Sequence, residues 1–146
     1  MNTIDFRESL IEYIKNSLSN DEEFKDDNIN VDKAYSTKQP TTSSIFVYIM
    51  DNTEAELLLS QEGNPYYTFQ IFVYGKKMKH NGKLVSAMDM TTLLVDFVIK
   101  YFNKNIIKDN INNIISIKRV NTSPILPLDD NIELYYSAVR YEGEIQ

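Results

Sequence analysis

The sequence has no cysteine and only one histidine, His80, among its 146 residues. Without cysteine the chain forms no disulfide and has no thiolate nucleophile, zinc finger or iron–sulfur ligand. A single histidine also excludes most transition-metal sites and any chemistry that needs a pair of histidines. These absences remove the commonest metal and covalent mechanisms, and the composition points to no enzyme.

Long apolar runs are also scarce. The longest apolar stretches, residues 45–50 and 93–99, are far shorter than the roughly 20 residues that span a bilayer. The N-terminus is acidic and amphipathic, which is not typical of a secretory signal. We therefore expect a chain that is cytosolic when it is made and has no membrane partner.

The chain has fewer basic than acidic residues: 15 Lys and Arg against 21 Asp and Glu, which gives a net charge of −6. This balance argues against a protein that grips DNA or RNA through its phosphates. The sequence also lacks a glycine-rich phosphate loop, a nucleophile elbow and a dinucleotide-binding fingerprint. We expect no enzyme and no cofactor, and we assign no catalytic or metal-ligating residue. His80 lies among lysines and is expected to be exposed.

The length fits one domain, residues 1–146, which is large enough to form its own core. Apolar residues recur at helical spacing over 4–19 and 86–102, and Ser86 is placed to cap the second helix. β character marks five segments: 31–36, 44–51, 66–74, 114–121 and 132–141. We predict an α+β fold, with an antiparallel or mixed sheet of four to five strands on which the N-terminal helix and the long central helix pack.

Three segments between or within these elements carry further expectations. Segment 44–51 has apolar side chains on both faces, which is typical of a central strand covered on both sides. Segment 54–61 fits either a strand end or a short helix. Segment 103–113 is expected to be a loop that is partly anchored to the core by its isoleucines.

Charged residues gather in two segments that we expect to be solvated. The basic loop contains Lys76, Lys77, Lys79 and Lys83. The acidic connector contains Asp21, Glu22, Glu23, Asp26 and Asp27, and it lacks the ligand spacing of a calcium-binding loop. If the two segments are complementary surfaces of neighbouring subunits, their association weakens with salt.

The chain is rich in aromatic residues, with 10 tyrosines and 7 phenylalanines. Tyrosine combines a large apolar body with a polar tip and is enriched at protein interfaces. Four tyrosines alternate outward or lie at predicted strand ends: Tyr66, Tyr74, Tyr135 and Tyr141. They fit either a sheet face that meets another subunit or a tyrosine-rich core with hydroxyls at its rim.

Taken together, the chain resembles the tail terminator (tail completion) proteins of tailed bacteriophages and phage-tail-like bacteriocin particles. The resemblance lies in the order of elements over nearly the whole length. An amphipathic N-terminal helix is followed by the strand at 44–52, the aromatic strand at 66–74, a lysine-rich loop, one long helix and a strand pair that closes at 134–143. Such proteins form a ring, usually a hexamer, that sits on the last ring of the tail tube and ends its polymerisation.

The resemblance implies a structural protein whose partners are further copies of itself, the tail tube protein and, in some particles, sheath and neck or head-connector proteins. DNA would pass only as cargo, and assembly would occur in the bacterial cytoplasm before the protein joins the particle. Loops 37–43, 76–83 and 121–131 could each reach the tube. Two alternatives stay open: another head–tail connector or stopper of the same particle, and a small monomeric adaptor that docks an acidic ligand through 76–83.

Overall fold

The computed structural model describes residues 3–34, 40–52, 66–111, 114–128 and 131–145. Its helices are α1 (Thr3–Asn20), α3 (Ala87–Tyr101) and the one-turn α4 (Lys104–Ile107). Its strands are β1 (Asn30–Lys33), β2 (Ser44–Asn52), β3 (Tyr66–Lys76), β4 (Met78–His80), β5 (Lys83–Val85), β6 (Ile114–Thr122), β7 (Leu126–Leu128) and β8 (Asn131–Ile145).

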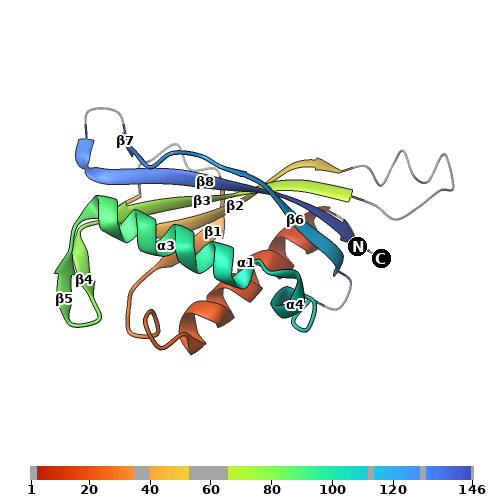
Figure 1. Cartoon of the computed structure of the whole chain (residues 1–146), viewed down its shortest axis with the longest axis horizontal. Helices are drawn as coiled ribbons and strands as arrows, with labels where there is room; N and C mark the ends of the chain where they lie inside the picture. Colours follow the sequence, from red (N-terminus) through yellow and green to blue (C-terminus); the bar gives the residue numbers. More distant parts are fainter. Residues whose placement is uncertain (1–2, 35–39, 53–65, 112–113, 129–130, 146) are drawn as a thin grey trace, which may run out of the picture.

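The fold is α+β, as predicted, with a mixed sheet at its centre (Figure 1). Five strands follow the order β1-β2-β3-β8-β6, and β7 also pairs with β8. β1 runs parallel to β2, whereas the other pairs in this sheet are antiparallel. The long helices α1 and α3 lie on one side of the sheet, with α3 against β3 and β8 and α1 against β1 and β2.

The core fills the space between the helices and the sheet. Alternate residues of β3, from Tyr67 to Val73, are fully buried, because the two-residue period of a strand points them all toward the helices. Phe6 of α1 stacks on Tyr67 at 4.4 Å between ring centroids and meets Phe69 edge-on at 5.6 Å. The aromatic residues of this face therefore build the core.

A glycine lets α3 approach the sheet closely. A Cβ added at Gly75 would lie 2.2 Å from Oγ1 and 2.4 Å from the backbone N of Thr91, and 2.6 Å from the carbonyl oxygen of Ala87. The N-terminal turn of α3 is fixed by Ser86, whose side chain accepts a hydrogen bond from the backbone N–H of Asp89 (3.2 Å). The helix cap predicted at Ser86 is confirmed.

The two edges of the sheet are short or irregular. β1 has four residues. On the other side, the register of β6 against β8 shifts between Ile114 and Ser116 and again between Arg119 and Asn121. Between β6 and β7, the backbone N–H of Ser123 donates to the carbonyl oxygen of Ala138 (2.8 Å), which continues the contact with β8.

The differences from the predicted elements lie mainly in the connections. Segment 76–83, which the sequence favours as the solvated tip of a hairpin, comprises the end of β3, β4 and the β4–β5 turn, and 121–131 includes the end of β6 and the short β7. Segment 103–113 contains α4 and is anchored by Ile107 and Ile111, which are buried. The prediction for 54–61 and part of loop 37–43 fall outside the described residues. Within the described residues, no helix is both long and apolar enough to cross a bilayer.

Candidate functional site

The side of the sheet away from α1 and α3 has no helix packed on it in the described part of the chain (Figure 1). It carries aromatic side chains. In β2, Ile45 and Val47 are fully buried under the helices, whereas Tyr48 is 45% and Met50 39% exposed. The prediction that segment 44–51 is covered on both sides is therefore wrong for the single chain. We call this side the bare face; its residues include Phe46, Tyr48, Met50, Phe72, Tyr74, Tyr136 and Arg140.

The aromatic rings of the bare face contact one another across three strands. Tyr74 of β3 stacks with Tyr136 of β8 at 6.2 Å between ring centroids and meets Phe46 of β2 edge-on at 5.5 Å. Phe72 and Tyr48 lie 6.4 Å apart. A contiguous apolar patch of this kind, rather than scattered exposed residues, is typical of a protein-interaction surface. Its enrichment in tyrosine agrees with that role.

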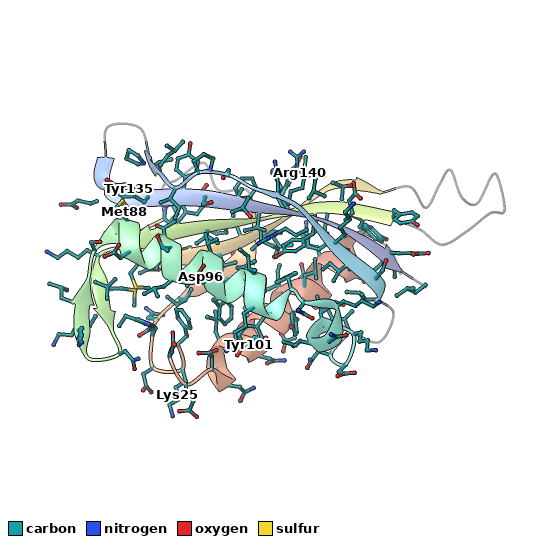
Figure 2. The ribbon with its side chains drawn as sticks, viewed as in Figure 1. Lys25, Met88, Asp96, Tyr101, Tyr135 and Arg140 are labelled. Carbon is teal, nitrogen blue, oxygen red and sulfur yellow. The ribbon has the colours of Figure 1, made fainter. Side chains whose placement is uncertain are left out.

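Arg140 introduces a positive charge beside these rings. It lies opposite Gln70 in the pairing of β8 with β3, and its side chain extends from the bare face (Figure 2). Its Nε atom is buried and has no hydrogen-bond partner among the described residues. The Nε atom of Arg7 in α1 is also buried without a partner, and an atom that the chain itself covers is closed to an acceptor from outside.

The predicted basic loop is largely the hairpin β4–β5. Asn81 (φ 54°) and Gly82 (φ 80°) both have positive φ, as a two-residue type I′ hairpin turn requires. Three of its lysines are exposed and form no ion pair within the described chain: Lys77, Lys79 and Lys83. Lys76 ends β3 instead and donates from Nζ to the carbonyl oxygen of Thr41 (3.2 Å).

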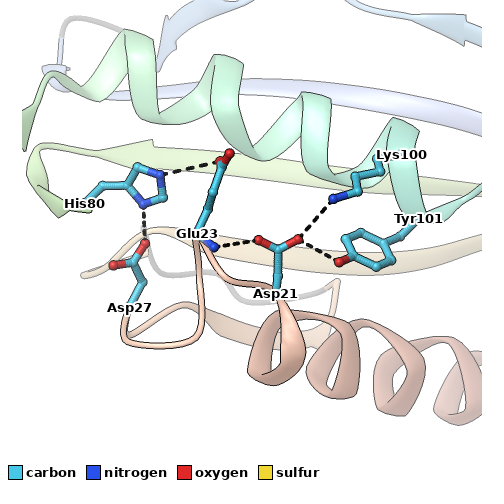
Figure 3. A network of polar contacts seen from close by, with 6 residues as sticks. All are labelled: Asp21, Glu23, Asp27, His80, Lys100 and Tyr101. Carbon is cyan, nitrogen blue, oxygen red and sulfur yellow. Dashed lines mark hydrogen bonds and ion pairs between the residues drawn. The ribbon is translucent and has the colours of Figure 1, made fainter.

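His80 is buried, with 6% of its surface exposed, so the prediction of an exposed histidine is wrong. Its Nδ1 lies 2.5 Å from Oδ2 of Asp27, and its Nε2 lies 4.0 Å from Oε2 of Glu23 (Figure 3). Its ring packs on Phe24 at 4.8 Å between centroids. Alternation along β4 turns His80 toward the body of the protein while Lys79 points to solvent. His80 thus attaches the hairpin to the acidic connector.

The acidic connector is also not a freely solvated loop, because Asp21 is buried at its start. Oδ2 of Asp21 accepts hydrogen bonds from the Tyr101 hydroxyl (2.6 Å) and from Nζ of Lys100 (3.4 Å) (Figure 3). Oδ1 accepts one from the backbone N–H of Glu23 (2.9 Å). The Tyr13 hydroxyl donates to the carbonyl oxygen of Tyr101. This network ties the C-terminal ends of α1 and α3 together.

The pKa of Asp21 reflects that network. Burial alone raises the pKa of the carboxyl, but the hydrogen bonds from Tyr101 and Glu23 and the charge of Lys100 outweigh burial and hold the pKa below its usual value of 3.8. Burial of the phenol, followed by the hydrogen bond to the Asp21 carboxylate and its charge, raises the pKa of Tyr101 to about 12. Asp21 is therefore a stabilising anion at neutral pH.

We predict that Asp21→Asn lowers the free energy of unfolding at pH 7 by about 1–3 kcal/mol, since a charge-assisted acceptor is lost in a buried position. The depressed pKa means that this stabilisation is present above the unfolded pKa of Asp and is lost as the pH falls through the folded pKa. The difference between the two proteins should therefore shrink below about pH 4. Urea unfolding at pH 7 and pH 3 checks this, and an equal difference at both pH values contradicts it.

The other connector acids differ in their surroundings. Glu22 is exposed and pairs with Lys25 at 3.2 Å, and Asp26 is exposed. The side chain of Asp27 is only 6% exposed and is occupied by His80. Asp21 and Asp27 thus make their contacts within the chain. The connector acids that remain accessible to a basic loop of a neighbouring subunit are Glu22, Glu23 and Asp26. The basic and acidic segments meet inside one chain; their pairing between subunits stays a prediction.

The four tyrosines singled out by the sequence lie in different environments. Tyr66 is 47% exposed at the start of β3, and Tyr74 is half-buried on the bare face. Tyr135 is half-buried and lies opposite Gly75 in the pairing, on the side where α3 packs. Tyr141 is 1% exposed, and its ring stacks on Phe69 at 5.6 Å, so it belongs to the core, one of the two placements that the sequence left open. Alternation in β8 places it on the helix side.

In the described part of the chain no group of three or more His, Asp or Glu side chains is arranged to hold a metal ion. The bare face offers aromatic rings and one guanidinium, and the hairpin offers exposed ammonium groups. No known protein family matches the sequence, and no curated protein is significantly similar to it.

Proposed function

We propose that the chain is a structural protein that forms a ring on the end of a phage-type tail tube, ends polymerisation of the tube and joins it to the neck or head. The observation that carries the proposal is the bare face, an aromatic surface left uncovered on one side of a well-packed sheet. A protein that works by assembly needs such a surface, because buried apolar area is the main source of association free energy.

The order of the elements supports the same proposal. An N-terminal helix, a two-strand unit, a lysine-bearing hairpin, a long helix and a final strand pair follow one another as in the tail terminator proteins that the sequence resembles. A closed ring requires contacts between two different surfaces of each subunit, so that a rotation closes the assembly. The chain offers distinct surfaces on the two sides of its sheet and at its hairpin.

A monomeric adaptor is the second candidate function. It is favoured by the hairpin, whose exposed Lys77, Lys79 and Lys83 lack partners in the described chain and could contact an acidic ligand. An adaptor of this kind would not need the bare face, which is why we place it second.

The proposal predicts overlong tails when the gene is deleted from the particle that encodes it. Without a cap the tube continues to polymerise, so electron micrographs should show tubes several times the normal length or with no defined length. The wild-type gene supplied in trans should restore the length, and so should Ile106→Asp, a control at an apolar residue of α4 that is 38% exposed. Tyr48→Asp, on the bare face, should not restore it.

Tubes of normal length in the deletion strain would contradict a terminator. If such tails also failed to join heads, the alternative of a connector or stopper in the same particle would be supported instead. If Tyr48→Asp restored the length as well as Ile106→Asp does, the bare face would not be the assembly surface.

A further inference from the structure

The turn of the β4–β5 hairpin is the one place in the sequence where an asparagine precedes a glycine, Asn81-Gly82. An asparagine side chain can react with the backbone nitrogen of the next residue, and a glycine there favours the reaction because it has no Cβ to obstruct it. Both residues are exposed, and a Cβ added at Gly82 would meet no atom within 4 Å. The turn is therefore open to water.

The conformation of the closed turn opposes this reaction. Asn81 (φ 54°) and Gly82 (φ 80°) lie in the left-handed region, as a type I′ turn requires. In such a turn the first residue has ψ of about +30°, which places the Gly82 nitrogen and the Asn81 side chain on opposite sides of the Cα–C bond. Ring closure needs both groups on the same side. The backbone must therefore leave the turn conformation before the nitrogen can reach the side-chain carbon.

The hairpin depends on the rest of the chain to stay closed. β4 and β5 pair with each other over three residue pairs and form a sheet of their own. A two-stranded hairpin is marginally stable by itself. His80 fixes this one to the connector, through Asp27 at 2.5 Å and the ring of Phe24 at 4.8 Å between centroids. Loss of the His80–Asp27 contact is therefore expected to let the hairpin open while the main sheet stays folded.

We propose that Asn81-Gly82 is a site of spontaneous deamidation whose rate is controlled by the His80–Asp27 contact. The Gly82 nitrogen bonds to Cγ of Asn81, the Cγ–Nδ2 bond breaks, and ammonia leaves with the Gly82 amide proton. Water then opens the cyclic imide at one of its two carbonyls, which leaves aspartate or isoaspartate at position 81. Water is the only co-reactant, and the inference does not depend on the tail function.

The modification changes both the charge and the shape of the hairpin. A carboxylate forms at the tip, next to Lys83 and two residues from Lys79, which are exposed and form no ion pair within the described chain. Isoaspartate also places the side-chain methylene in the main chain, which does not fit the dihedral angles of a two-residue turn. The deamidated hairpin thus presents less positive charge and a loosened turn to an acidic partner.

Incubation of the full chain at pH 7, followed by peptide mass spectrometry, measures the reaction. The product is recognised by the gain in mass when the amide NH2 group becomes a hydroxyl. We expect the folded protein to react at least about tenfold more slowly than the same chain unfolded in guanidinium chloride. His80→Ala and Asp27→Ala should each accelerate the reaction severalfold toward the unfolded rate. Asp27→Ala leaves the residues beside Asn81 unchanged, so its effect does not arise from an altered neighbour.

Two further variants are controls. Lys79→Ala removes a side chain that points to solvent from the same strand and should keep the wild-type rate. Phe6→Leu weakens the core within α1, which begins at the end of the molecule opposite the hairpin (Figure 1). It lowers the stability of the whole fold but leaves the His80 contact in place, so it should accelerate deamidation less than Asp27→Ala does.

Four results would overturn the proposal. Absence of deamidation in the unfolded chain would remove the site itself. Equal rates for the folded and unfolded chain would mean that the closed turn gives no protection. Wild-type rates in both His80→Ala and Asp27→Ala would show that their contact does not control the turn. An equal acceleration by Phe6→Leu and Asp27→Ala would mean that the turn opens only when the whole chain unfolds.

Discussion

Replacing Gly75 by Ala is expected to lower the free energy of unfolding by about 3 kcal/mol, near the upper end for overpacked positions. The added Cβ would meet the backbone of α3 at 2.4 and 2.6 Å, at Thr91 N and Ala87 O, as well as the Thr91 side chain at 2.2 Å. A backbone clash cannot be relieved by a side-chain rotation, so α3 must shift away from β3 and loosen the contacts along its buried side. Urea unfolding followed by circular dichroism measures the loss.

Gly143→Ala is the matched control for this prediction. Gly143 is also a buried glycine of the central sheet, but its added Cβ would lie 3.5 Å from the ring of Phe69, an ordinary contact distance. We expect this variant to change the free energy of unfolding by less than about 1 kcal/mol, in either direction. If both alanine variants lose the same stability, the close approach of α3 is not the cause.

Replacing His80 by Ala is expected to cost about 3 kcal/mol of stability, because the side chain of Asp27 then remains buried without its partner at 2.5 Å. The loss of the ring also removes its contact with Phe24. We expect the effect to be greatest in the hairpin, so amide hydrogen exchange should accelerate in β4 and β5 before it does in β3. Exchange measured by mass spectrometry or NMR reports this difference.

Lys79→Ala is the control, since Lys79 precedes His80 on the same strand but points to solvent. It should leave both stability and exchange nearly unchanged. In a double-mutant cycle, His80→Ala and Asp27→Ala should be strongly non-additive, because either change alone breaks the same contact. Additive losses, or unchanged exchange in β4 and β5, would mean that His80 does not hold the hairpin.

Local sequence patterns predicted the elements well because their causes are local. The two-residue period of 66–74 identified the strand, and Ser86 identified the start of α3. The hairpin at 76–83 also had a local signal, the Asn81-Gly82 pair, whose two positive φ values fit a type I′ turn.

The environment of His80 could not be predicted in the same way. Its partner Asp27 lies 53 residues earlier in the sequence, and the contact exists only because the hairpin folds back on the connector. Burial of Asp21 likewise depends on Tyr101, which is 80 residues away. The sequence left both a core and an outer placement open for Tyr141, because the side of β8 that faces α3 is set by strand order. No pattern within the strand distinguishes its two sides.

The bare face was only partly predictable from the sequence. Apolar residues on both sides of 44–51 indicated that both sides of the strand would be covered, and the structure covers one. The signal was correct about the chemistry of the second side, but a single chain contains no element that packs there within the described residues. The pattern therefore describes the surface that we propose is covered in the assembly.

The margins of the sheet limit how this protein can aggregate. An aromatic surface exposed at high concentration is a hazard mainly when a long, flat outer strand allows further strands to add in fibril-like stacks. Here one outermost strand is only four residues long, and the opposite one is interrupted by two register shifts and followed by Pro124 and Pro127. Templated strand addition is thereby hindered on both flanks, so the exposed aromatic side of the sheet does not by itself lead to growth of a fibril strand by strand.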